Sequence, residues 1–61
     1  MPSFFFIKQN DLYLANDRIR AYYTNQQFVQ DKLNAKFFLN KNNAIAMVVA
    51  LGLDNLEIVE D

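Results

Sequence analysis

The chain lacks cysteine, histidine and tryptophan, and it has one glycine and one proline among its 61 residues. Without cysteine it forms no disulfide, and without cysteine or histidine it has no conventional zinc site. The single glycine excludes a glycine-rich phosphate-binding loop. A chain of this length buries only about 60% of the surface that its unfolded form exposes. We therefore expect self-association to supply part of its stability.

The same absences argue against catalysis. Acid–base, nucleophilic and metal-dependent mechanisms mostly use histidine, cysteine or carboxylates gathered in a pocket. Glu57 and Glu60 are three residues apart in an expected strand, so they face opposite sides of it. We predict a non-enzymatic protein with no catalytic residue, no metal, no cofactor and no small-molecule substrate.

The composition predicts a single folded domain over residues 1–61. Hydrophobic residues make up 52% of the chain, with six Phe and three Tyr, far more than disordered segments carry. The longest apolar stretch, residues 44–53, is too short for a membrane span, which needs about 20 residues. Residues 1–7 lack the basic start and the cleavage site of a signal peptide. The missing cysteines fit a reducing cytoplasm.

Short apolar runs predict strands in the first part of the chain. Residues 3–8 and 12–15 are strand-forming and are separated by turn residues, which predicts a tight hairpin. Residues 18–23 alternate between apolar and polar side chains, which predicts a half-exposed third strand. Thr24 and Gln27 have the spacing of a capping box, which allows a short helix reaching residue 34.

The clearest helix pattern covers residues 41–51, with Asn40 as its N-cap and Gly52 as its terminator. The apolar residues at helical spacing that we expect in the core are Ala44, Ile45, Met47, Val48 and Leu51. Residues 35–39 are a strand or a buried connection, and residues 56–60 alternate as a final strand. This order predicts a small α+β domain: an antiparallel sheet of three to four strands with one main helix packed on one face.

The strand expected at residues 4–7 is apolar on both faces. Phe4 and Phe6 lie on one face and Phe5 and Ile7 on the other, and one helix covers only one of them. Three things would cover the second face: a small cluster beneath residues 24–34, a second copy of the chain, or a partner protein. The candidate residues for a protein interface are Phe5, Ile7, Tyr13 and Tyr22.

The charge distribution provides an alternative function. All six basic residues precede residue 42, where they outnumber the acidic ones by three, whereas residues 42–61 carry four acidic residues and no basic one. The strand expected at residues 18–23 would expose Arg18, Arg20 and Tyr22 on one face, and Lys36 would extend that surface toward phosphates and stacked bases. Because the net charge is −1, nucleic-acid binding ranks below protein binding.

Several segments together carry a resemblance to a known group of proteins. The matching positions are residues 5–8, 11–14, 35–38, 40–41, 44, 51–52 and 56–59. In these segments the chain resembles short proteins of phages and prophages of low-GC Gram-positive bacteria. The resemblance implies an accessory role of a mobile element, exerted by binding in the cytoplasm of the bacterial host cell, and it implies no particular site residue.

Overall fold

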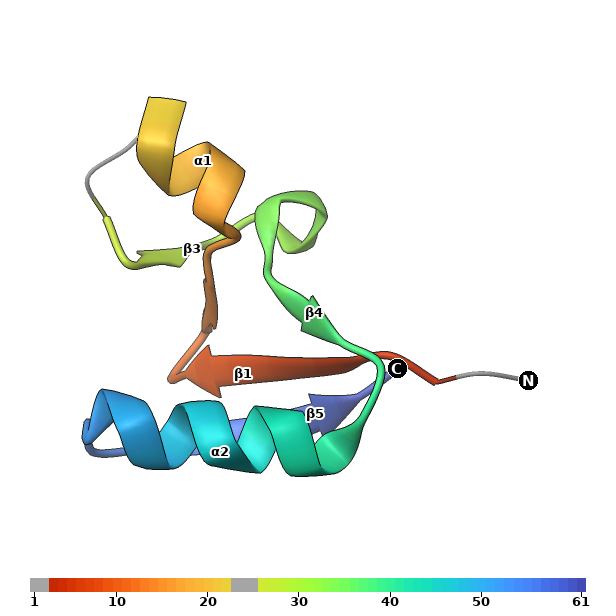
Figure 1. Cartoon of the computed structure of the whole chain (residues 1–61). Coiled ribbons are helices and arrows are strands. Elements are labelled where there is room, and N and C mark those ends of the chain that lie inside the picture. The colour runs from red at the N-terminus through yellow and green to blue at the C-terminus, as the bar shows by residue number, and fades with distance from the viewer. Residues whose placement is uncertain (1–2, 23–25) are drawn as a thin grey trace.

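A computed structural model describes residues 3–22 and 26–61 of the chain (Figure 1). The elements are, in order, β1 (Phe5–Gln9), β2 (Leu12–Leu14), α1 (Asp17–Tyr22), β3 (Phe28–Val29), the 3₁₀ helix η1 (Lys32–Asn34), β4 (Phe37–Phe38), α2 (Lys41–Leu51) and β5 (Leu56–Glu60). The strands form one antiparallel sheet, and α2 is its main helix. The predicted α+β class is therefore confirmed, and the described residues form five strands, where the sequence predicted three to four.

β1 is the central strand of a curled sheet. It pairs along its whole length with β5, from Phe5 opposite Glu60 to Gln9 opposite Leu56. Its other edge is shared, because β2 pairs with its C-terminal half and β4 with its N-terminal half. β2 turns away from β1 and pairs with β3. The chain just before β4 returns to the end of β2, where the Lys36 N–H donates to the Leu14 carbonyl at 2.8 Å.

The hairpin between β1 and β2 is confirmed, and its turn is made by residues 10–11. Asn10 has a φ of 58°. Asparagine tolerates this left-handed conformation better than most residues, because its short polar side chain hydrogen-bonds locally. The turn places Gln9 opposite Leu12 and so sets the register of the whole hairpin.

The predicted ends of α2 are also confirmed. The Asn40 side chain accepts a hydrogen bond from the Asn42 N–H at 2.8 Å, as an N-cap does. At the other end Gly52 has a φ of 63°, and its N–H donates to the Val48 carbonyl. Between these ends α2 lies along β1 and β5 on one face of the sheet (Figure 1).

The core lies between α2 and the sheet. Its buried members are Ile7, Leu14, Phe28 and Ala44, surrounded by partly buried Phe5, Phe38, Met47, Val48, Leu51, Leu56 and Ile58. Ile7 and Ala44 are both 0% exposed. Leu56 and Ile58, two residues apart on β5, both pack against this core, as the alternation of residues 56–60 requires.

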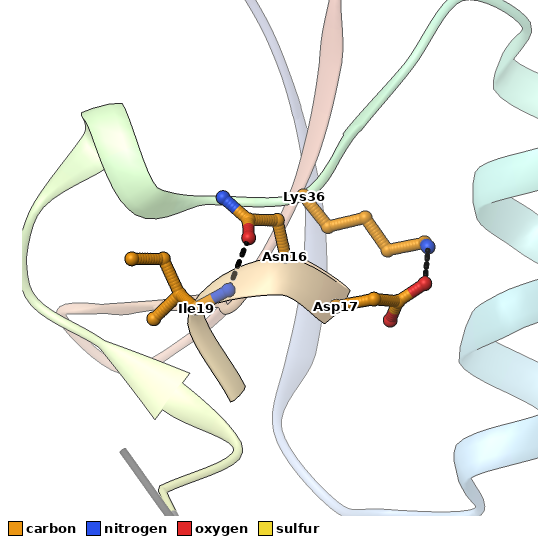
Figure 2. A network of polar contacts seen from close by, with 4 residues as sticks. All are labelled: Asn16, Asp17, Ile19 and Lys36. Carbon is orange, nitrogen blue, oxygen red and sulfur yellow. Dashed lines mark hydrogen bonds and ion pairs between the residues drawn. The ribbon is translucent and has the colours of Figure 1, made fainter. Parts of the chain in front are cut away.

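The strand predicted at residues 18–23 is wrong, because residues 17–22 form α1. The Asn16 side chain accepts a hydrogen bond from the Ile19 N–H at 2.7 Å (Figure 2). The Asn16 carbonyl accepts one from the Arg20 N–H at 3.2 Å. Asn16 is thus an N-cap, and Asp17 follows it in the first turn, where a negative charge is favourable. These local hydrogen bonds stabilise a helix here, although the side chains alternate between apolar and polar as they would in a strand.

The helix allowed between residues 24 and 34 is wrong over its described part. Phe28 and Val29 form β3, and only residues 32–34 are helical, as the single 3₁₀ turn η1. The Asp31 side chain caps this turn by accepting from the Leu33 N–H at 3.0 Å. Thr24, the first residue of the expected capping box, lies outside the described residues.

Candidate interaction surface

The position of α2 decides which residues of β1 reach the surface. Ile7 is fully buried beneath the helix, so its assignment to a protein interface does not hold. Phe5 is half-buried and packs against the same core. The face of the sheet that lies away from α2 carries Phe6 of β1 and Phe4, the residue just before β1.

The sheet register explains this choice. On the helix side Ile7 has Ile58 directly opposite it on β5, and Leu14 of β2 joins the same cluster. On the other side Lys8 lies opposite both Tyr13 and Glu57. α2 therefore covers the side on which the neighbouring strands place aliphatic residues, because burying the charged side would cost desolvation free energy.

The face away from α2 is built around Phe6. The Phe6 and Tyr13 rings meet edge to face, with their centroids 5.9 Å apart, and the Lys32 Nζ lies 5.0 Å from the Phe6 centroid. Lys32 also forms an ion pair with Asp61. As a result Phe6 is only 8% exposed. Of the segment 24–34, Lys32 therefore lies over Phe6, whereas Phe28 belongs to the main core, against which Phe5 packs.

Next to Phe6 this face is open and concave. A hollow of about 260 Å³, which we call the aromatic hollow, is lined by Phe4, Phe6, Lys32, Leu33, Ala35 and Phe37. The Phe4 and Phe37 rings form a second edge-to-face pair with centroids 5.3 Å apart. Phe37 is 56% exposed and Leu33 is 90% exposed. The sequence predicts Phe4 in a strand, Phe37 in a strand or a buried connection and Leu33 in a short helix, so no local pattern indicates that they form one surface.

A second, more polar hollow of about 410 Å³ adjoins the first, since Leu33, Ala35 and Phe37 line both. Its remaining lining residues are Asn16, Asp17, Arg18 and Lys36. The Lys36 Nζ lies 3.1 Å from the Asp17 Oδ2, so the side chain extends from the β4 segment toward the start of α1 (Figure 2). The two hollows form one concave surface with an apolar end and a charged end.

The proposed nucleic-acid face is not assembled in this structure. Arg18 and Arg20 lie two residues apart in α1, where successive positions turn by about 100°, so they point about 200° apart. Lys36 is paired with Asp17. Tyr22 ends α1, and its side chain lies outside the described part of the structure. The single basic strand face on which this alternative depended does not form.

A further apolar surface lies on the outward face of α2. Ile45, expected in the core, is 43% exposed, Val49 is 75% exposed and Leu53, just past the helix, is 40% exposed. Ala46 and Ala50 are exposed beside them. One feature of the sequence indicates this surface: residues 44–51 are apolar on every side of the helix, which is typical of a helix that is buried on all sides.

Within residues 3–22 and 26–61, no group of three or more acidic residues is placed to hold a metal ion. No helix in that part of the chain is long and apolar enough to cross a membrane.

The fold and the surface define a small α+β domain with one open, aromatic concave face and one uncovered helix face. Comparison with protein-family models, with curated proteins and with solved structures finds no match to this chain. Its function is therefore inferred from its own residues.

Proposed function

We propose that this protein is a non-enzymatic protein-binding module and that a partner protein binds in the aromatic hollow. The observation that carries the proposal is the exposure of Phe37 and Leu33, 56% and 90%, at the rim of a concave apolar surface. Aromatic residues are enriched where protein interfaces are energetically strongest. An exposed apolar concavity on a small domain is typical of such a site.

The surface indicates the chemistry of the partner. An apolar side chain would fill the hollow beside the Phe4–Phe37 ring pair, because both rings lose contact with water when the hollow is occupied. The adjoining Asp17–Lys36 pair and Arg18 would contact polar groups of the same partner at the charged end. Such charged residues at a rim affect specificity and association rate more than affinity.

The biological setting is part of the same proposal. The resemblance to short phage and prophage proteins supports an accessory role in the cytoplasm of a bacterial host cell. The partner would then be a host or phage protein. The genes that flank the coding sequence test this setting, because an accessory phage gene is expected among lysogeny, packaging or host-takeover genes.

Binding can be tested by affinity capture from a nuclease-treated lysate of a low-GC Gram-positive bacterium. Three baits are compared: the unmodified protein, Phe37→Ser in the hollow and Leu12→Ser as a matched control. Leu12 is 39% exposed and belongs to β2, and it does not line the hollow. We expect one protein to be retained by the unmodified bait and the Leu12 variant and to be lost with Phe37→Ser.

Two results would contradict this proposal. A protein captured equally by all three baits would bind elsewhere on the molecule. Capture seen from an untreated lysate but absent from the nuclease-treated one, together with direct binding of RNA or DNA that weakens steeply with salt, would favour the nucleic-acid alternative instead. Circular dichroism of both variants should match that of the unmodified protein, because both substituted side chains are exposed.

A further inference from the structure

We infer that the outward face of α2 binds a second copy of this chain, with the two α2 helices antiparallel across a two-fold axis. This surface is separate from the aromatic hollow, and the inference goes beyond the proposed function. The face consists of Asn42, Ile45, Ala46, Val49 and Ala50 of α2, together with Leu53, which follows the helix. All six are exposed, and Val49 at 75% is the most exposed of the large apolar ones.

The spacing of these residues is that of a helix–helix seam. Asn42, Ile45, Ala46 and Val49 follow one another at intervals of three, one and three residues, which places them on one side of the helix. Ala46 and Ala50 lie beside Val49, and small side chains let two helix backbones approach closely. The opposite side of α2, centred on Ala44, is already packed on the sheet.

The charges identify a second copy as the occupant. The segment from residue 42 to residue 53 has no charged side chain, whereas Lys41 lies at one end of it and Asp54 at the other, both exposed. In an antiparallel pair whose axis passes between residues 47 and 48, Lys41 of each copy lies beside Asp54 of the other. The same operation brings Ala46 opposite Val49 and Ile45 opposite Ala50, so the surface is complementary to itself.

The helix dipole favours the same orientation. The first turn of α2 contains no acidic residue, and Lys41 lies at its N-terminus, the positive end of the dipole. An antiparallel neighbour brings the negative C-terminal end of its α2 next to Lys41. The pair therefore relieves an unfavourable interaction that each copy has alone.

The size of the face indicates a weak dimer. A standard interface buries about 800 Å² per partner, which is roughly a sixth of the 4568 Å² exposed by the described chain. An 11-residue helix is about 16 Å long and offers less than that area. We expect a dissociation constant in the micromolar range or weaker.

Sedimentation equilibrium of the purified protein tests the inference. The measurement covers 5 µM to 1 mM, roughly the concentration range that such a weak dimer requires. We expect a monomer–dimer equilibrium that Val49→Asp weakens by about 100-fold or more, because it buries two like charges at the centre of the seam. Since Val49 is largely exposed, the circular dichroism spectrum of this variant should be unchanged. Phe37→Ser is the control and should dimerise like the unmodified protein.

Charge exchange tests the orientation. Lys41→Asp and Asp54→Lys should each weaken the dimer by roughly tenfold, since each disrupts two rim contacts of modest strength. Combining the two substitutions in one chain should restore it, and mixing the two single variants should produce a heterodimer. Restoration in both experiments would establish the antiparallel register.

Three results would overturn the inference: a monomer at every concentration, a dimer that Val49→Asp leaves intact, or a double exchange that fails to restore association. None of them bears on the aromatic hollow. If the hollow is the partner site, Val49→Asp still captures the partner that Phe37→Ser loses. Failure of the dimer and failure of partner binding are thus distinguished.

Discussion

Replacing Ile7 and Ile45 by alanine, one at a time, tests the position of α2 on the sheet. The two residues have the same side chain and receive the same substitution, but Ile7 is 0% exposed and Ile45 is 43% exposed. Ile7 of β1 lies beneath α2, directly opposite Ile58 of β5 and in the same buried cluster as Ala44. Ile45 lies at the edge of the outward helix face. The difference between the variants therefore reports which side of each element is buried.

The magnitudes follow from burial. Removing a fully buried isoleucine side chain and leaving a cavity costs about 2–5 kcal/mol. Ile45 is a little more than half buried, so Ile45→Ala should cost about 1 kcal/mol. A chain of 61 residues has a free energy of unfolding of about 3–9 kcal/mol in all. Ile7→Ala should therefore remove a large share of the stability and Ile45→Ala a small one.

Urea unfolding followed by far-ultraviolet circular dichroism measures both costs. With a slope of about 1 kcal/mol per molar urea for so small a chain, the midpoint should fall by about 2 M or more for Ile7→Ala and by about 1 M for Ile45→Ala. The protein is kept at about 5 µM, where the weak dimer dissociates and contributes little. Equal shifts, or a larger shift for Ile45→Ala, would refute the assignment of Ile7 to the core.

Three further predictions concern single elements. Asn16→Ala should lower the free energy of unfolding by about 1 kcal/mol, because it removes the N-cap of α1. Asp17→Asn should lower it by less than about 0.5 kcal/mol, because Asp17 is 79% exposed. Urea midpoints compare the two variants, and equal losses of stability would contradict the assignment of Asn16 as the N-cap. Gly52→Ala should cost about 1 kcal/mol from backbone strain at φ 63° alone, as a Cβ there meets no atom within 4 Å; Gly52→Asn should lower the melting temperature less. Ala44→Leu should destabilise by about 1–3 kcal/mol, because this position is 0% exposed; an unchanged melting temperature would show that α2 packs more loosely than described.

Local signals predicted several elements correctly. The hairpin follows from two apolar runs around turn residues, and α2 follows from Asn40, Gly52 and the spacing between them. The error at residues 18–23 was also local. Asn16 and Asp17 are residue types that are common in turns, but the same types cap helices, and the hydrogen bond from the Ile19 N–H to the Asn16 side chain decides for the helix.

The interaction surfaces could be predicted only in outline. Periodicity showed that β1 is apolar on both faces, and it assigned Ile45 to the core stripe. It could not show which face of β1 the helix would take, because that depends on the residues of β2 and β5 that lie beside Ile7. The aromatic hollow likewise joins β1, η1 and β4, which are far apart in the sequence.

The sequence by itself determined the class of the fold and both ends of α2, because turn and cap residues act on their neighbours in the chain. It also determined that the chain has more apolar surface than one small core absorbs. Only the tertiary structure decided where that surplus lies. The pairing of β1 with β4 and β5 turns Ile7 inward and leaves Phe37 exposed, and the packing of α2 on that sheet leaves Val49 exposed. These contacts join segments that are far apart in the sequence, so no local pattern contains them.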